Sequence, residues 1–314
     1  MPGRIVLLHT SPRLPAGLLT ARAWDLVRAN PVYAAADTPQ STALAEAGAP
    51  VRVVAGGAAD WVAALLSADE PTVVWLAGAD GDPSLGTFLS RRIVGLENPP
   101  TLEAEYGSWD PPGARLLDVV ATMDRLRDEC PWDREQTHAT LAPYLLEEAY
   151  ETVDAIDSGD LAHLREELGD VLLQVAFHAR VGADDDPPFD IDDVAAHLVE
   201  KLVRRHPHVF GDVNVSGADE VHANWEQIKR AEKARESSMD GVPLAQPALS
   251  LAAKLQSRAE RAGITAEPAD VDDLGATLFA LVARARAAGQ DPEAALRRAA
   301  LAYARAVRDA ERAG

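Results

Sequence analysis

The chain has 314 residues, of which 47% are hydrophobic and 25% are charged. This mix is typical of globular proteins, and the length suggests two or three domains. A net charge of −20 argues against general binding of a nucleic-acid polymer, which depends on a surplus of Lys and Arg. No apolar run approaches the ~20 residues of a membrane helix, and we recognise no signal peptide. The single cysteine, Cys130, closes no intrachain disulfide, which favours a cytoplasmic protein.

Residues 1–105 alternate short apolar runs with helix-like stretches. The runs predict strands over Arg4–His9, Pro31–Ala35, Val51–Val54 and Thr72–Leu76. The stretches between them predict helices over Ala21–Ala29, Thr42–Ala47 and Ala58–Ser67. Such alternation is typical of a small parallel α/β domain. Pro and Gly around residues 98–100 and 110–113 then indicate a linker.

From Leu116 onward the apolar residues recur at helical spacing. This spacing predicts helices over Leu116–Arg127, Tyr144–Ile156, Leu161–Arg180, Val194–Arg205, Trp225–Glu236 and Ala248–Arg261, with further helix to the end of the chain. Asp160 stands where an N-cap would begin the third of these helices. The remainder of the chain is therefore expected to be all-α.

One predicted helix, around residues 145–157, has an acidic face opposite an apolar one. The acids are Glu147, Glu148, Glu151 and Asp154, and the apolar residues are Leu145, Leu146, Ala149, Val153 and Ile156. A solvated surface is the simplest explanation of such a face. The segment contains no Lys or Arg, however, and like charges at i,i+4 destabilise a helix. We therefore favour a cationic partner from outside the segment.

A second acidic pair, Glu167 and Asp170, lies in the following helix, whose apolar composition predicts burial. A favourable interaction with the helix dipole is the alternative, but these acids lie about two turns in, where that effect has faded. Buried acids are costly unless they are paired or bind a metal. Glu148 and Glu151 share the same i,i+3 spacing, so two facing helices would gather four carboxylates. Ligands that are all oxygen suit Mg²⁺, with Mn²⁺ as a possible substitute.

A di-iron site is the alternative metal centre, and it requires Glu-x-x-His on two helices. One such string occurs, Glu135–His138, in a stretch that we predict to be a loop. Bound Mg²⁺ leaves positions for substrate phosphates, which would need cations nearby. Lys201, Arg204 and Arg205 could supply them, although a basic last turn is also favoured by the helix dipole. Trp225 and Trp132 could each stack on a base or belong to a core.

A series of short motifs lies between residues 112 and 265. They are Cys130–Asp133 with Gln136 and Thr137, Glu147–Glu151 (EEAYE), Glu167–Asp170 (ELGD), Lys201–Phe210, Trp225–Lys229 and Leu244–Ile264. Each motif is weak alone, whereas their order and spacing together are specific. Together they resemble the MazG family of nucleoside triphosphate pyrophosphohydrolases.

The resemblance implies an all-α catalytic domain over residues 112–240 that forms a homodimer and binds the nucleotide between its helices. It implies Mg²⁺-dependent cleavage of nucleoside triphosphates, ribo- or deoxyribo-, into nucleoside monophosphate and pyrophosphate, which would clear nonstandard or excess nucleotides. It implies the metal ligands Glu148, Glu151, Glu167 and Asp170. It also implies phosphate contacts from Lys201, Arg204 and Arg205 and a base contact from Trp225. We add Lys229 and Trp132 as substrate-binding candidates, and Glu147 as the residue that orients the attacking water.

Two regions depart from the complete family pattern. Residues 244–314 resemble a degenerate second MazG half-repeat: Asp273–Arg286 aligns with Glu167–Arg180, but Ala276 replaces Asp170. No acidic helix precedes it, so we expect packing or dimer contacts there. Residues 1–105 resemble a truncated tetrapyrrole methylase without its Gly-rich first loop, and we expect no methylase activity.

Two other functions are compatible with the same residues. The protein could be a catalytically silent nucleotide- and metal-binding sensor or scaffold, or a helical module whose acids only keep it soluble. The acidic residues of the catalytic domain are all present, whereas the half-repeat over residues 244–314 has lost the corresponding ones. This contrast favours an enzyme.

Overall fold

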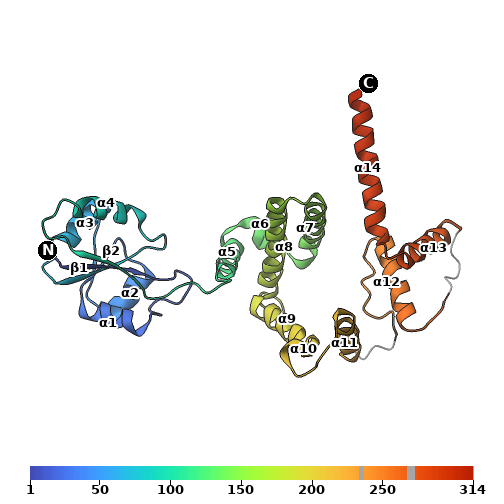
Figure 1. Cartoon of the computed structure of the whole chain (residues 1–314), viewed down its shortest axis with the longest axis horizontal. Helices are drawn as coiled ribbons and strands as arrows, with labels where there is room; N and C mark the ends of the chain where they lie inside the picture. The colour runs from blue at the N-terminus through green and yellow to red at the C-terminus, as the bar shows by residue number, and fades with distance from the viewer. Residues whose placement is uncertain (233–236, 267–272, 314) are drawn as a thin grey trace. The chain divides into compact units, whose positions relative to one another are not determined.

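The computed structural model of the protein describes residues 1–232, 237–266 and 273–313 (Figure 1). The chain forms two compact units, residues 1–196 and 197–314. Among the described residues, no helix combines the length and the apolar character that crossing a membrane requires. The parallel α/β start and the helical remainder agree with the sequence prediction.

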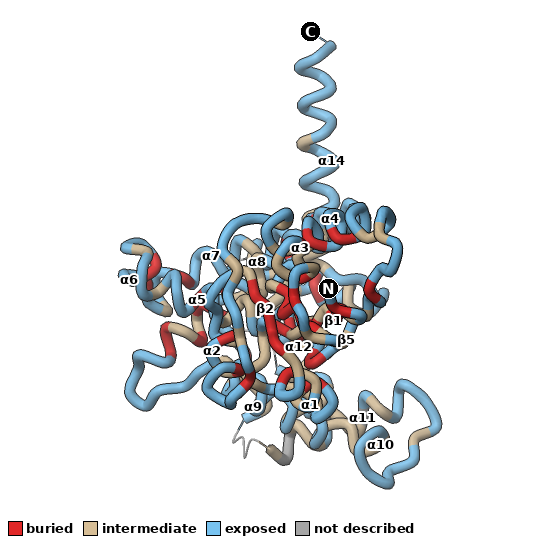
Figure 2. Tube along the Cα trace, turned by 90° about the vertical axis from the view of Figure 1, so that its left-hand side faces the viewer, coloured by how far each residue is buried: buried red, intermediate tan, exposed pale blue. Residues whose placement is uncertain are grey.

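A five-stranded parallel sheet in the order β3-β2-β4-β1-β5 organises the first 106 residues. Its strands are β1 (Arg4–His9), β2 (Val32–Ala34), β3 (Val51–Val53), β4 (Thr72–Leu76) and β5 (Thr101–Tyr106). In the register of the central pair, Ile5 of β1 lies opposite Val73 of β4. Buried residues concentrate in the three inner strands β1, β2 and β4, whereas β3 and β5 at the edges have none (Figure 2). Four strands were expected from their apolar runs, which are typical of parallel strands covered on both faces.

The fifth strand was not expected, because the segment before Asp110 reads as a linker. Glu103 and Glu105 interrupt its apolar residues, so β5 lacks the pattern of a buried parallel strand. As the edge of the sheet, β5 keeps one side open to solvent and tolerates these charges. Glu103 pairs with Arg4 of β1 at 2.5 Å, which joins the edge strand to its neighbour.

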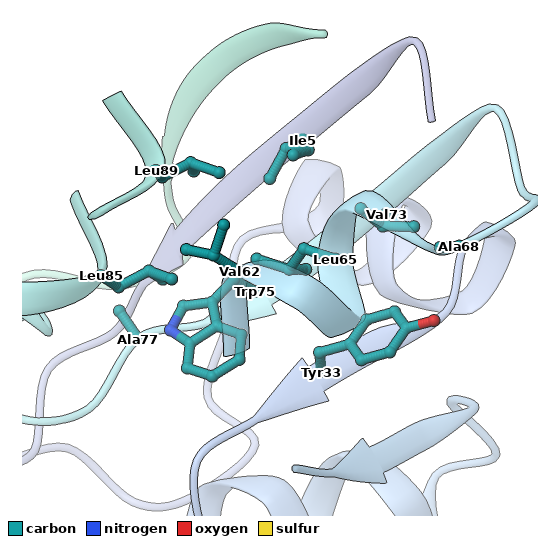
Figure 3. Packing of buried hydrophobic residues seen from close by; sticks show 10 residues of the cluster. All are labelled: Ile5, Tyr33, Val62, Leu65, Ala68, Val73, Trp75, Ala77, Leu85 and Leu89. Atoms are coloured by element: carbon teal, nitrogen blue, oxygen red, sulfur yellow. The ribbon is translucent and has the colours of Figure 1, made fainter. Parts of the chain in front are cut away.

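Helices cover both faces of the sheet (Figure 1). One face carries α1 (Ala21–Ala29) and α2 (Pro39–Glu46), and the other carries α3 (Ala58–Leu66) and α4 (Pro83–Ile93). Figure 3 shows Leu65, Leu85 and Leu89 packed on the second face around Trp75. Each fully buried leucine contributes about 1.5–3 kcal/mol. The unexpected α4 contains Gly86 and several hydroxyl residues of weak helix propensity, and Pro83 begins it.

The first unit continues with α5 (Arg115–Glu129), α6 (Pro131–Glu135), α7 (His138–Ser158) and α8 (Leu161–Gly182). The prediction of a loop after Pro131 is wrong, because residues 131–135 form the short helix α6. The helix α7 begins before the predicted Tyr144, since Thr137 and Thr140 form a capping box that starts it. Asp160 caps α8 as predicted, accepting hydrogen bonds from the backbone N–H groups of Ala162 and His163.

The apolar surfaces of α7 and α8 are less buried than the sequence suggests. Leu146 and Ile156 of α7 are more than half exposed, and so is Leu168 of α8. The prediction that α8 is buried therefore holds for only part of its surface. Its buried part includes Phe177, which joins Leu141 of α7 and Met123 of α5 in a small core.

The second unit contains only helices among its described residues. The helix α9 (Ile191–Arg205) crosses into it and is followed by α10 (Pro207–Phe210), α11 (Ala218–Ala231), α12 (Ala248–Arg261), α13 (Asp273–Ala287) and α14 (Pro292–Ala313). The prediction for α12 is confirmed at both ends, whereas α11 begins before the predicted Trp225. Predicted helix over residues 233–236 lies outside the described residues. Most of α14 is exposed (Figure 2).

Candidate active site

Two helices of the first unit, α7 and α8, form an antiparallel hairpin that carries the predicted acidic residues. The chain reverses at Gly159, whose φ of 73° is a left-handed conformation that favours glycine. The Asp160 cap then starts α8 at once. Because α7 and α8 pack along each other, the EEAYE stripe of one helix meets the ELGD stripe of the other.

Three carboxylates converge between the two helices. Glu148 and Glu151 from α7 and Glu167 from α8 each offer an oxygen, and these oxygens all lie within 4.8 Å of one another. Carboxylates this close repel one another, and a bound divalent cation would remove that repulsion. Among the described residues, no other cluster of three or more His, Cys, Asp or Glu side chains comes together in this way.

The pKa of Glu148 shows that the acids act on one another. Partial burial raises it first, and the negative charges of Asp170, Glu151, Glu147 and Glu167 raise it further. Asp170 is the largest of these charge contributions, although none of its oxygens belongs to the group of three. The structure thus places Asp170 at the edge of the cluster.

Glu167 provides the strongest evidence that the cluster suits a metal ion. Its side chain is 10% exposed, and its Oε1 contacts Nε2 of His163 at 2.9 Å. Its Oε2 is buried and accepts no hydrogen bond from any described residue. A buried carboxylate oxygen without a donor is costly, and coordination of a cation would satisfy it. An all-oxygen donor set suits Mg²⁺ or Mn²⁺.

Glu147, the candidate for orienting water, is exposed on α7 next to Glu148. Asp154, which shares the predicted acidic face, is also exposed. Trp132 lies on α6 with half of its surface exposed. Its ring meets Tyr144 and Phe177 edge to face, with centroids 6.0 and 6.1 Å away. Trp132 therefore borders the small core while keeping one side open.

The cations predicted to bind phosphate lie on α9 in the second unit, and the other candidates there, Trp225 and Lys229, lie on α11. Arg204 and Arg205 both bind the carboxylate of Glu232, and these bonds lower its pKa to about 2. The Trp225 ring has the Arg205 guanidinium 5.3 Å and the Lys229 ammonium 4.3 Å from its centroid, both in cation–π range. Lys201 on α9 is half-buried. The sequence analysis did not anticipate that Glu232 binds the two arginines it had assigned to phosphate.

Comparison with known proteins connects this acidic hairpin to a described family. A family model for the MazG nucleotide pyrophosphohydrolase domain matches residues 136–210, which include the four predicted ligands. A nucleoside triphosphate pyrophosphohydrolase of Escherichia coli K12 is 42% identical over 231 residues, covering 63% of this chain and 86% of that protein. The chain belongs to the MazG family. As a member it is an enzyme, a hydrolase acting on acid anhydrides.

Two further relatives extend beyond the matched domain. A nucleoside triphosphate pyrophosphohydrolase of Mycolicibacterium smegmatis is 50% identical over 209 residues, or 64% of this chain and 61% of its own length. An uncharacterized 26.1 kDa protein of Streptomyces cacaoi is 54% identical over 240 residues, which is 75% of this chain and 99% of that protein. Likeness to the MazG family thus reaches well past residues 136–210.

The sequence analysis did not predict two histidine contacts in the α7–α8 hairpin of this MazG protein. His163 precedes Glu167 by one helical turn, and this i,i+4 spacing could have revealed its contact with the carboxylate. His138 joins α7 to α8 through a 2.7 Å contact between its Nδ1 and that of His178. Glu135 and His138 stand on separate helices, α6 and α7, so they do not form the Glu-x-x-His pair of a di-iron site.

Proposed function

We propose that this MazG enzyme hydrolyses nucleoside triphosphates in the cytoplasm to nucleoside monophosphate and pyrophosphate, with Mg²⁺ as cofactor. The observation that carries the proposal is the convergence of Glu148, Glu151 and Glu167, with one buried oxygen of Glu167 left without a donor. These residues lie within the segment that matches the family model. Both ribo- and deoxyribonucleotides, including nonstandard ones, are candidate substrates.

Glu148, Glu151, Glu167 and Asp170 would hold the metal. Bound Mg²⁺ neutralises phosphate charge and lowers the pKa of a bound water. His163 holds one oxygen of Glu167, which leaves the other directed to a ligand. The Glu147 carboxylate orients the attacking water, whose oxygen bonds to the α-phosphorus as the bond to the β-phosphate oxygen breaks. The electron pair of that bond leaves with pyrophosphate, and the proton of the water passes to solvent.

The basic residues of α9 and α11 take the remaining substrate contacts. Lys201, Arg204 and Arg205 neutralise the charge that develops on the leaving pyrophosphate. Because Arg204 and Arg205 already bind Glu232, the triphosphate must replace this carboxylate as their partner. Trp225 and Trp132 offer ring faces to the base, and Lys229 supports Trp225 through its cation–π contact.

A homodimer accounts best for the apolar surface of the hairpin. Leu146 and Ile156 of α7, together with Leu161 and Leu168 of α8, are each more than half exposed. Large exposed apolar groups on adjoining helices are characteristic of interaction surfaces. A second copy of the chain would cover them, and light scattering during gel filtration measures this directly. Replacing Leu146 and Leu168 by Gln should then yield a monomer.

Product analysis tests the proposed reaction. Purified protein is incubated with ATP, dATP and the other common triphosphates, with Mg²⁺ or with EDTA, and products are separated by ion exchange. We expect monophosphate and pyrophosphate only with metal, and loss of at least 100-fold in rate for Glu148→Gln and Asp170→Asn. The exposed residue Glu166 serves as a matched control, since Glu166→Gln removes the same charge nearby. Diphosphate and phosphate as products would refute attack at the α-phosphorus.

A catalytically silent sensor is the alternative function. It has the same acids and cations but predicts metal-dependent nucleotide binding without turnover. The same experiment separates the two, because bound nucleotide would be recovered unchanged with Mg²⁺ present.

A further inference from the structure

The short helix α6 carries Trp132 but is not stable enough to fix its position alone. With five residues, Pro131–Glu135, α6 is far below the ~12–15 residues at which an isolated helix becomes even marginally stable in water. The Trp132 ring meets Tyr144 and Phe177 only edge to face, and half of its surface is exposed. Contacts from outside α6 must therefore determine where this ring lies.

Gln136, the residue that follows α6, connects Trp132 to α7. Its side chain is buried, and its Nε2 donates a 2.9 Å hydrogen bond to the backbone carbonyl oxygen of Trp132. Its Oε1 accepts a 2.8 Å hydrogen bond from the hydroxyl group of Thr140, in the first turn of α7. A carbonyl oxygen can only accept, so the contact with Trp132 fixes which end of the amide is the donor. One side chain thus joins the backbone of Trp132 to α7.

Arg127 of α5 holds the same turn from another helix. Its Nη1 donates to the backbone carbonyl oxygens of Asp133, at 2.6 Å, and of Gln136, at 3.0 Å. The last carbonyl groups of a helix have no partner within it, and Arg127 supplies one at the end of α6. The Arg127 side chain is only 13% exposed, and its Nε binds the carboxylate of Asp184. The position of α6 therefore depends on both Arg127 and Gln136.

The two rings that contact Trp132 stand on the helix faces that carry the acids. Tyr144 precedes Glu148 by one turn of α7, and Phe177 follows Asp170 by two turns of α8. Residues at these spacings lie on one face of a helix. One turn rises about 5–6 Å, so Trp132 lies against the acidic face of α7 a short way from the proposed metal ligands. The base of a nucleotide is one sugar away from its phosphates, which brings a base within reach of this ring when the acids hold the phosphates.

We propose that Gln136 is a positioning residue for nucleotide binding, which holds the backbone of Trp132 so that the ring can stack on the base. Arg127 supports the same placement by fixing the end of α6. The inference rests on the proposed function, because it takes the acidic hairpin as the site of the phosphates. Stacking of one base on an aromatic ring changes affinity by about 5- to 150-fold, so a displaced ring should have a measurable effect.

Steady-state kinetics with ATP as substrate and inorganic triphosphate as competitive inhibitor test the proposal. Both molecules present phosphates to the acids, but only ATP has a base. Gln136→Glu keeps the acceptor for Thr140 and replaces the donor to Trp132 by a carboxylate oxygen, which repels the carbonyl group. We expect the KM for ATP to rise about tenfold, with little change in kcat or in the inhibition constant of inorganic triphosphate.

Further variants separate positioning from a general effect on the fold. Trp132→Ala should raise the KM for ATP by a similar factor, and the double variant should raise it no further, because Gln136 acts through the ring. Gln136→Met has a similar length but makes neither hydrogen bond, and it replaces Gln136→Glu if circular dichroism shows that the latter is unfolded. Gln290→Glu, exposed in the second unit, makes the same chemical change and should leave the KM unaltered.

Three results would overturn the proposal: an unchanged KM for ATP in the folded Gln136 variant, an equal loss of inhibition by inorganic triphosphate, or a double variant with a higher KM than Trp132→Ala alone. If the original chain binds ATP without hydrolysing it, the proposed function fails separately. Calorimetric dissociation constants for ATP and inorganic triphosphate then take the place of KM and the inhibition constant, and the same comparisons decide. A chain that binds no ATP overturns both proposals.

Discussion

Replacing Glu167 by Gln should stabilise the metal-free enzyme, although it removes a residue of the proposed active site. Gln keeps an oxygen for His163 and relieves a charge whose second oxygen has no donor among the described residues. Two unit charges 4.8 Å apart repel by about 1 kcal/mol in water and about 3.5 kcal/mol at an effective dielectric constant of 20. Because Glu151 is exposed, solvent screening brings the expected gain to about 1–2 kcal/mol.

The assay is denaturant unfolding of the original chain and of Glu167→Gln, in EDTA and in MgCl₂. In EDTA the variant should unfold at a higher denaturant concentration, by about 1–2 kcal/mol in free energy. In MgCl₂ the order should reverse, because a ligand that binds only the folded state stabilises the original chain by mass action. Glu166→Gln, one residue away and exposed, should change neither measurement by more than about 0.5 kcal/mol.

A loss of stability in EDTA would refute this reasoning. It would mean that the Glu167 carboxylate is satisfied within the protein, and that the cluster is structural. The reasoning would also be contradicted if MgCl₂ changed the unfolding free energies of Glu166→Gln and Glu167→Gln equally. The effect of Mg²⁺ would then depend only on the net charge of the chain and not on the Glu167 side chain.

The remaining predictions concern the pH dependence of stability, the Arg204–Arg205 pair and the small core around Leu141. Burial and the neighbouring carboxylates raise the pKa of Glu148 above its ordinary value of 4.5, so its charge destabilises the folded state. The metal-free chain should therefore gain stability as the pH falls through this raised pKa toward 4.5, and Glu148→Gln should lack this gain. Glu232→Gln removes the carboxylate that Arg204 and Arg205 both bind, and should lower the KM for triphosphate. It should also remove stability that the original chain keeps above pH 4.5 and loses as pH falls toward 2. Leu141→Ala should cost about 2–5 kcal/mol in unfolding free energy, because Leu141 is 1% exposed in the small core between α7 and α8. Urea titrations and steady-state kinetics measure these effects, and an unchanged KM for Glu232→Gln would contradict competition by Glu232.

The sequence predicted those helices and strands that are marked by a continuous apolar run or by a capping residue. The apolar runs of β1 and β4 located the centre of the sheet, and Asp160 located the start of α8. Elements with mixed patterns were missed. Thus β5 carries Glu103 and Glu105 at the sheet edge, and α4 has weak intrinsic helix propensity.

The acidic candidates could be named from the sequence, but which of their carboxylates meet could not. The i,i+3 spacing identified both pairs, Glu148 with Glu151 and Glu167 with Asp170, as candidates. The absence of Lys and Arg around residues 145–157 supported the first pair, and the apolar composition of the following helix supported the second. Helical periodicity places residues on a face, and it says nothing about which helix lies opposite. Only the α7–α8 hairpin shows that three of these carboxylates meet, with Asp170 at their edge.

By itself, the sequence determined the order of the α/β and helical parts, the MazG motifs and the identity of the acidic residues. The tertiary structure decided which groups are satisfied: Glu167 by His163 on one oxygen only, Arg204 and Arg205 by Glu232, and Gln136 by Thr140 and the carbonyl group of Trp132. The physical reason is that hydrogen bonds and ion pairs depend on the distance between atoms, which residues separated in sequence acquire only when the chain has folded.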